Sequence, residues 1–352
     1  MATTLATNTS LNTETKISIK SELEKKVDQL VGAAPQYCKS ILTRMAHASL
    51  RNAQTLCEFI TIETSERNLK LSSRLTKIKI LCLFNRHLEY KQFEQITKND
   101  IRSYLDSLKK PESQDPTHKW IGTYNTRQMV ISKFFKWLYN YHSEPDSNKW
   151  ITPPCVQGIK QLPRKEKSPY KPSDIWTSEE HAVFLKYCPE KRDRCYHSVA
   201  NDTSARPHEL LCLRIKDIKF RLSESTGKQY AEVHLLESKT NTRKLPLIFS
   251  LPYVKDWIES HPKSNESNAF LFPSLADYNF GDQLSENALY KQYTRTYKKR
   301  YFPDLLKESL IPGRDKAYLK SMLTKPRNPY IIRHSALTAK SKILKESTLL
   351  DP

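Results

Sequence analysis

The chain has 352 residues and a formal net charge of +20, because 58 lysines and arginines face 38 aspartates and glutamates. This positive excess is larger than solubility requires and indicates a polyanionic partner, DNA or RNA first; a basic surface without such a partner is the alternative. No apolar run is long enough to cross a bilayer, and the N-terminus has no secretory signal. No long basic amphipathic helix suggests binding to an anionic membrane.

The sequence offers little support for metal or nucleotide chemistry. The seven cysteines are scattered without a C-x-x-C pair, which is typical of free thiols in a reducing cytoplasm. Cys188, Cys195 and His197 lie close together in the chain, but their spacing matches no ordinary zinc site. The six glycines form no glycine-rich phosphate loop. We therefore expect neither a metal nor a nucleotide cofactor.

The first part of the chain predicts a flexible tail followed by a helical domain. Residues 1–34 are assigned to the tail, because its start is rich in Thr and Asn. Residues 35–144 place apolar side chains at helical spacing, and Thr97 and Asp100 offer capping groups before one of these helices. A wide aromatic face follows, formed by Val130, Phe134, Trp137, Leu138 and Tyr141. Its simplest interpretation is a hydrophobic core.

Residues 145–172 break the helical pattern, because prolines recur there among lysines and an arginine. This composition predicts an extended, positively charged linker. Such a linker would suit a chain that wraps around a duplex. An ordinary solvated linker explains the composition equally well.

The remainder, residues 173–352, predicts a second domain of mixed structure. Thr177 followed by two glutamates is typical of a helix start. Alternation of polar and apolar residues predicts strands at 230–236 and 244–249. Further helices are expected at 192–201, 252–260, 285–301 and 330–345. The predicted fold is therefore mainly α with a small antiparallel β-sheet.

Three basic residues in this domain form a candidate phosphate site. Arg206 lies in the segment Ser-Ala-Arg-Pro-His-Glu-Leu-Leu, and Arg333 lies in Pro-Tyr-Ile-Ile-Arg-His-Ser. Lys239 lies on a polar turn between the two predicted strands. Guanidinium groups stabilise the charge that gathers on a phosphodiester in its transition state, and a lysine can protonate the leaving oxygen.

These segments resemble the signatures of the tyrosine recombinases, the phage integrase family, in their archaeal or viral form. The resemblance rests on the Arg206 segment, which continues Cys-Leu-Arg-Ile-Lys-Asp-Ile, on Lys239 followed by Pro-Leu, and on the Arg333 segment. It implies an N-terminal helical core-binding domain of SAM-like fold and an α+β catalytic domain. It also implies a site-specific DNA recombinase or integrase from a mobile element or virus, which clamps duplex DNA, needs no cofactor, and assembles as a tetramer at synapsis. Such a protein would be cytoplasmic and associated with the nucleoid.

The resemblance implies a role for each matching residue. Arg206 and Arg333 would hold the scissile phosphate, and Lys239 would be the general acid. Tyr330 stands where the family usually has histidine; a phenol can donate a hydrogen bond to a phosphate oxygen but is a poor proton shuttle at neutral pH. His334 is expected to pack within its helix.

The family's nucleophile is a tyrosine downstream of the second arginine, and no tyrosine follows Tyr330 in this sequence. We therefore expect a chain truncated before its nucleophile, or one that receives a tyrosine from another polypeptide, so that its status as an enzyme stays open. The alternative function is a non-catalytic DNA-binding protein that occupies or regulates recombination sites. A type IB-like topoisomerase would need the same missing tyrosine.

Overall fold

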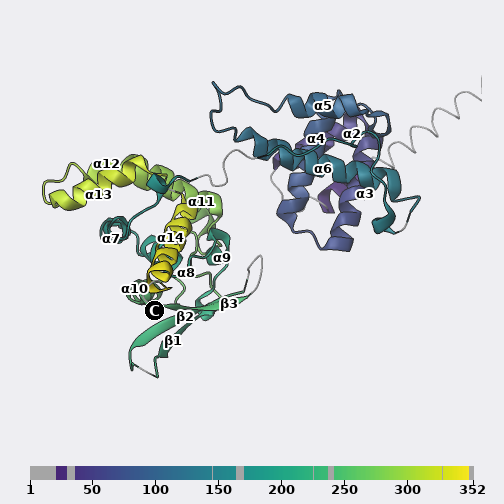
Figure 1. The fold of residues 1–352 in the computed structure, drawn as a ribbon. Coiled ribbons are helices and arrows are strands. Elements are labelled where there is room, and N and C mark those ends of the chain that lie inside the picture. Colours follow the sequence, from purple (N-terminus) through teal and green to yellow (C-terminus); the bar gives the residue numbers. More distant parts are fainter. Residues whose placement is uncertain are drawn as a thin grey trace, which may run out of the picture. The chain divides into compact units, whose positions relative to one another are not determined.

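The computed structural model describes residues 21–29, 36–144, 146–163, 170–224, 226–236, 242–326 and 328–348. The chain divides into two compact units, Met1–Lys167 and Ser168–Pro352 (Figure 1). Each unit has a hydrophobic core of its own. The fold is mainly helical with one small antiparallel sheet, as expected. Among the described residues, no helix combines the length and apolar character needed to cross a bilayer.

The first unit is all helical. Its described elements are a helix at 21–29, α2 (Gln36–Ala48), α3 (Leu50–Arg67), α4 (Leu71–His87), η1 (Phe93–Gln95), α5 (Lys98–Asp106), α6 (Trp120–Asn140) and η2 (Ser147–Lys149). Thr97 caps α5 as predicted, since its side chain accepts from the Asp100 amide while its own amide donates to the Asp100 carboxylate. The aromatic face of α6 is indeed core: the Phe134 ring is fully buried, and its centroid lies 5.3 Å from that of Phe59.

Two expectations for this unit differ from the structure. Residues 21–29, which we assigned to a flexible tail, form a helix, because Leu23 and Val27 bury their side chains in the core of the unit. Part of the expected linker also belongs to this core, since Cys155 and Val156 are buried there. These apolar residues outweigh the prolines around them, which are compatible with the tight turn that the chain makes at this point.

The second unit combines helices with three strands. Its described elements are η3 (Pro172–Asp174), α7 (Ser178–Tyr187), α8 (Lys191–Thr203), α9 (Pro207–Leu211), η4 (Ile215–Asp217), β1 (Ile218–Leu222), β2 (Gln229–Leu235), β3 (Arg243–Leu247), α10 (Leu251–Glu259), η5 (Asp277–Asn279), α11 (Glu286–Lys291), the π-helix η6 (Gln292–Tyr301), α12 (Phe302–Leu305), α13 (Gly313–Thr324) and α14 (Pro329–Thr348). Thr177 caps α7 through the Glu180 amide, as predicted.

The strands form an antiparallel sheet in the order β1-β2-β3. On β2, Ala231, Val233 and Leu235 are fully buried, so the sheet has an inner face and an outer face. Strand β1 was not expected, because Ile218 alone among its residues is buried and no alternation marks it. The register pairs Leu235 with Arg243, which places Arg243 at the end of the described ladder.

Helix α14 packs against α8 and brings the C-terminal part of the chain to the centre of the unit (Figure 1). Ile331 and Ile332 are fully buried and hold the start of α14 in the core. The Ser335 hydroxyl accepts a hydrogen bond of 3.0 Å from the Trp176 amide. Trp176 lies near the start of the unit's sequence and Ser335 near its end. Because of this packing, the residues that follow Pro329 lie beside the end of α8 and the start of α9.

Candidate functional site

Arg206 is held by a buried carboxylate one helical turn away. It directly precedes α9, and its amide donates to Glu209 Oε2 at 2.8 Å. Its guanidinium donates through Nη1 to Glu209 Oε1 at 3.0 Å. The Glu209 side chain has no exposed surface, whereas that of Arg206 is 28% exposed. Arg206 is therefore fixed on one side and accessible on the other.

A second arginine uses the same carboxylate. Arg243 begins β3 and donates through Nη2 to Glu209 Oε2 at 2.8 Å. This residue was missed in the sequence analysis, which began the strand one residue later. The signal was present: Arg243 alternates with Leu245 and Leu247 on the face of β3 that pairs with the buried residues of β2. An arginine on a buried face requires an acid nearby.

Arg333 reaches the same place from α14. Its Nη1 donates a hydrogen bond to the backbone carbonyl of Ser204, two residues before Arg206. Burial lowers the pKa of Arg333, and the positive charges of Arg206 and Arg243 lower it further, while Glu209 acts in the opposite direction. The structure thus brings Arg206 and Arg333 together, although they are far apart in the sequence.

Tyr330, His334 and Lys239 are the other residues that the sequence analysis singled out. Tyr330 lies one turn before Arg333 on α14 and is 39% exposed. The His334 ring packs against the Tyr170 ring, with a centroid distance of 4.8 Å, as expected for a packing role. Burial lowers the pKa of His334, and the charge of Arg333 adds to the effect. Lys239 lies outside the described residues.

We call Arg206, Arg243, Arg333 and Glu209 the arginine cluster. Burial alone would raise the pKa of Glu209, but hydrogen bonds from Arg206 and Arg243 outweigh it and lower this pKa to about 2. The carboxylate is therefore ionised at neutral pH. Since one carboxylate faces three guanidinium groups, the cluster keeps a net positive charge and suits an anion.

A small hollow of about 150 Å³ opens beside the cluster. It is lined by Glu209, Cys212, Leu213, Arg214, Lys216, Asp217 and Leu236. Arg214 is itself occupied structurally, because its guanidinium lies over the Phe270 ring at 4.5 Å. The hollow is too small for a nucleotide-sized ligand, and its neighbouring charges are mixed.

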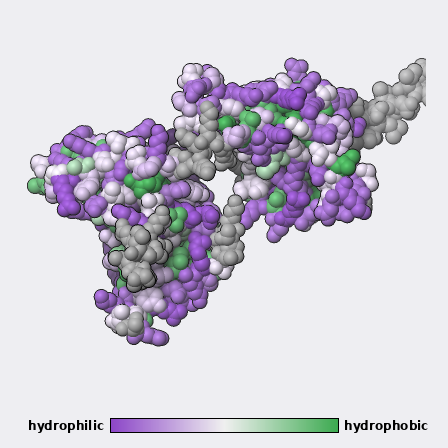
Figure 2. All heavy atoms as spheres, in the orientation of Figure 1, coloured by the Kyte–Doolittle hydropathy of each residue, from purple (hydrophilic) through white to green (hydrophobic). Residues whose placement is uncertain are grey.

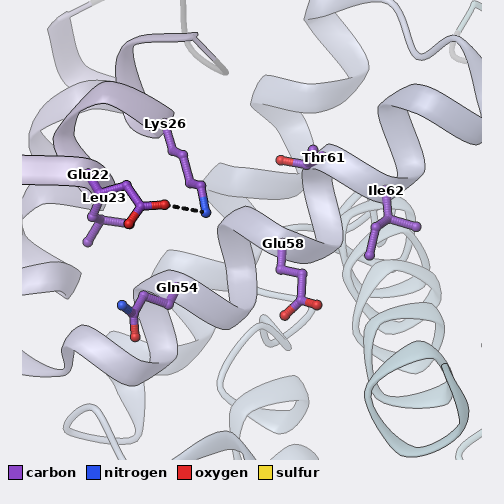
Figure 3. Close-up of a pocket in the computed structure, with 7 residues that line it drawn as sticks. All are labelled: Glu22, Leu23, Lys26, Gln54, Glu58, Thr61 and Ile62. Atoms are coloured by element: carbon purple, nitrogen blue, oxygen red, sulfur yellow. Dashed lines mark ion pairs between the residues drawn. The ribbon is translucent and has the colours of Figure 1, made fainter. Parts of the chain in front are cut away.

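The first unit holds a similar group of charges, because the buried Glu63 carboxylate pairs with Arg67, Lys77 and Lys133. A larger hollow of about 480 Å³ lies in the first unit between the helix at 21–29 and α3. Figure 3 shows that Lys26 there faces Glu22 of its own helix, at 3.3 Å, while Gln54, Glu58 and Thr61 line the α3 side. In the part of the chain that is described, no set of His, Cys, Asp or Glu side chains is arranged to hold a metal ion. Figure 2 shows a mainly hydrophilic face on both units, with apolar residues scattered over it.

Part of the second unit is similar to a known protein family. Residues 176–305 match the model described as the phage integrase family. This match includes Arg206 and Arg243 and ends before α14. No curated protein matches the chain in sequence.

Solved structures show the same fold over most of the chain. A lambda integrase dimer bound to a COC′ core site is 14% identical and has a TM-score of 0.51; the match covers 80% of this chain and 68% of that one. XerH site-specific recombinase on a palindromic difH substrate, in a post-cleavage complex, is 17% identical with a TM-score of 0.51, over 90% and 82% of the two chains. The Tn1549 transposon integrase with transposon right-end DNA is 14% identical with a TM-score of 0.50, over 82% and 87%. At these identities the likeness establishes the fold.

Proposed function

We propose that the chain binds duplex DNA and holds one phosphodiester at the arginine cluster, a proposal that the match of residues 176–305 to the phage integrase family supports. The function would be that of a site-specific recombinase or integrase of the tyrosine-recombinase type. The net charge of +20 supports a DNA partner, because phosphate neutralisation dominates the affinity of such proteins.

The observation that carries the proposal is the meeting of Arg206 and Arg333 beside Ser204. Two guanidinium groups in a partly buried site can donate to the non-bridging oxygens of one phosphate. Preorganised donors stabilise the transition state more than the ground state, because more negative charge gathers on those oxygens as the phosphorus is attacked. Glu209 supports this arrangement, since it is buried and fixes Arg206 without being accessible itself.

We assign the remaining roles by chemistry. Lys239 would protonate the leaving oxygen, and Tyr330 would donate a hydrogen bond to a phosphate oxygen from the adjacent turn of α14. The exposure of Tyr330 supports this role, since its side chain is accessible from solvent.

No tyrosine follows Tyr330 among the 352 residues. We propose that these residues bind the phosphate but do not themselves form a 3′-phosphotyrosyl bond. The alternative that we propose is a DNA-binding protein that occupies recombination sites and regulates an intact relative. The solved lambda integrase is a dimer on its core site, which supports assembly of this chain on DNA, with a tetramer proposed for synapsis.

The DNA-binding proposal is tested by fluorescence anisotropy with a labelled duplex over a series of salt concentrations. The logarithm of the binding constant should fall linearly with the logarithm of the salt concentration, and Arg206→Ala and Arg333→Ala should each reduce the slope by about 1. Lys307→Ala is the control, because its side chain is 76% exposed on a distant helix end and pairs with Asp304. An affinity that does not change with salt would contradict the proposal.

The nucleophile proposal is tested with a nicked duplex that traps covalent intermediates. We expect no protein–DNA adduct that survives denaturation. Dominant inhibition of a full-length relative in a recombination assay would support the regulatory alternative. An adduct mapped by mass spectrometry to Tyr330 or Tyr318 would overturn the proposal that the nucleophile is missing.

A further inference from the structure

Arg243 is the member of the arginine cluster that the phosphate-site motifs do not include. It starts β3 and lies on the inner face of the sheet, where its partner in register, Leu235, is fully buried. Lys244, the next residue, lies on the outer face and pairs in register with His234. The strand thus directs one cation toward the cluster and the next cation away from it.

The contacts of Glu209 place the guanidinium groups of Arg206 and Arg243 at one carboxylate. Arg206 already supplies two hydrogen bonds to this carboxylate, one from its amide and one from its guanidinium. The second arginine, at 2.8 Å from Glu209 Oε2, brings another guanidinium group to the same carboxylate.

The exposure of the side chains indicates which groups of the arginine cluster a ligand can contact. The Glu209 side chain has no exposed surface, whereas those of Arg206 and Arg243 are 28% and 30% exposed. An incoming anion would therefore contact the guanidinium groups and not the carboxylate. Burial lowers the pKa of Arg333, and the positive charges of Arg206 and Arg243 lower it further, which is consistent with three guanidinium groups that lie near one another.

We propose that Arg243 is a third phosphate-binding arginine, held beside Arg206 by their shared contact with Glu209. The inference rests on the proposed function and extends it, since it assigns to the site a ligand from the sheet in addition to those from α9 and α14. The expected ligand is a phosphodiester of duplex DNA. The three guanidinium groups would approach it from three different elements of the fold.

The first experiment measures the salt slope of DNA binding for Arg243→Ala, Arg243→Lys and Lys244→Ala, with the same labelled duplex used for the wild type. Each phosphate contact contributes about 0.9 to the slope. We expect Arg243→Ala to reduce the slope by about 0.9 and Arg243→Lys to keep it, because lysine retains the charge. Lys244→Ala removes the same charge from the outer face and should change the slope less than Arg243→Ala does.

A second experiment uses inorganic phosphate alone and does not depend on DNA. Phosphate should raise the melting temperature of the wild type more than sodium chloride of equal ionic strength, because a ligand that binds the native state stabilises it. This increase should be lost in Arg243→Ala and Arg206→Ala and retained in Lys244→Ala. If Arg243→Ala does not fold, Arg243→Lys still tests the inference, since loss of the bidentate fork should reduce the increase.

The outcomes separate this inference from the proposed function. A wild type whose DNA affinity does not depend on salt would contradict the proposed function itself. If Arg206→Ala and Arg333→Ala reduce the slope and Arg243→Ala leaves it unchanged, the proposed function stands and the role of Arg243 is overturned. Equal losses from Arg243→Ala and Lys244→Ala would also overturn it, because they would indicate a general charge effect.

Discussion

Arg333 of α14 donates a hydrogen bond to the backbone carbonyl of Ser204, which closes α8 in a left-handed conformation with φ of 52°. Lys340, two turns further along α14, donates to the Ser204 hydroxyl at 3.1 Å and to the Asp202 carbonyl. The Asp202 carboxylate in turn accepts from the Ser250 amide at 2.8 Å. The segment before Arg206 is therefore fixed by α14 on one side and by the start of α10 on the other.

These contacts predict different effects for substitutions of Arg333 and Lys340. Arg333→Ala should lower the free energy of unfolding by about 1–3 kcal/mol, since a buried carbonyl loses a charged donor, and should also weaken DNA binding. Lys340→Met should lower stability while it leaves the salt slope of DNA binding unchanged, because its contacts are to the protein. Urea denaturation and anisotropy measure the two effects. A slope that falls as much in Lys340→Met as in Arg333→Ala would contradict this division.

Glu209 should be indispensable to the site and sensitive to acid. Glu209→Gln keeps the shape but removes the buried negative charge that Arg206 and Arg243 share, so we expect a loss of about 3 kcal/mol in the free energy of unfolding. The folded pKa is lowered from 4.5 to about 2, so the carboxylate stabilises the fold fully above pH 4.5. That contribution is lost as pH falls toward 2.

The measurement is a series of urea denaturations between pH 2.5 and 6, in the window set by these two pKa values. Glu209→Gln should flatten the decrease in stability on the acidic side. Glu266→Gln is the matched control, because its side chain is 61% exposed and lies 3.7 Å from Lys263. An acid profile of Glu209→Gln identical to that of the wild type would show that Glu209 does not carry this dependence.

A buried histidine pair should make the second unit less stable in mild acid. His181 and His197 share a hydrogen bond of 2.8 Å, and His197 bonds in turn to the Tyr293 hydroxyl at 3.2 Å. Burial lowers the pKa of His181 to about 4 and that of His197 well below its usual value. The unfolded chain therefore takes up protons below pH 6.5 that the folded chain does not, and lowering the pH favours unfolding.

Thermal unfolding at pH values from 7 to 4.5 tests this dependence. His181→Phe keeps an aromatic ring beside Trp176 and should reduce the slope of stability against pH by up to about 1.4 kcal/mol per pH unit. His234→Gln, on the outer face of β2, is the control variant. If His181→Phe retains the full slope, the destabilisation in acid originates elsewhere.

Asn52 should be the most sensitive polar residue of the first unit. It is fully buried in α3, and its amide nitrogen donates to Asn85 Oδ1 at 3.1 Å and to the Lys91 carbonyl at 2.9 Å. Its oxygen accepts from the Phe93 amide at 3.1 Å. These bonds hold a turn in which Glu89 and Tyr90 both have positive φ.

Asn52→Ala would leave several of these groups unsatisfied, so we expect a loss of about 3 kcal/mol in the free energy of unfolding. Hydrogen exchange of the α3 and α4 amides assigns the effect to the first unit. Asn148→Ala is the control, because Asn148 is exposed on η2. A loss below about 1 kcal/mol would show that water replaces the missing amide at this turn.

Local sequence determined many of the helices and two of the three strands. Thr97 and Thr177 were identified as caps because the groups that they bond lie three residues away. Strand β2 was identified because alternate residues face a core. Strand β1 was missed, since the pattern of burial that would reveal it is produced by its neighbours and is absent from its own residues.

Local sequence was likewise insufficient to predict the whole arginine cluster. Motifs in the sequence were enough to select Arg206 and Arg333 as candidates. Arg333 lies beside Ser204 and Arg206 because Ile331 and Ile332 are buried and hold the start of α14 in the core. Arg243 lies beside Arg206 because of the register of β3. Hydrogen bonds within a turn are decided by neighbouring residues, whereas the convergence of charges from α9, β3 and α14 is decided by packing between distant parts of the chain.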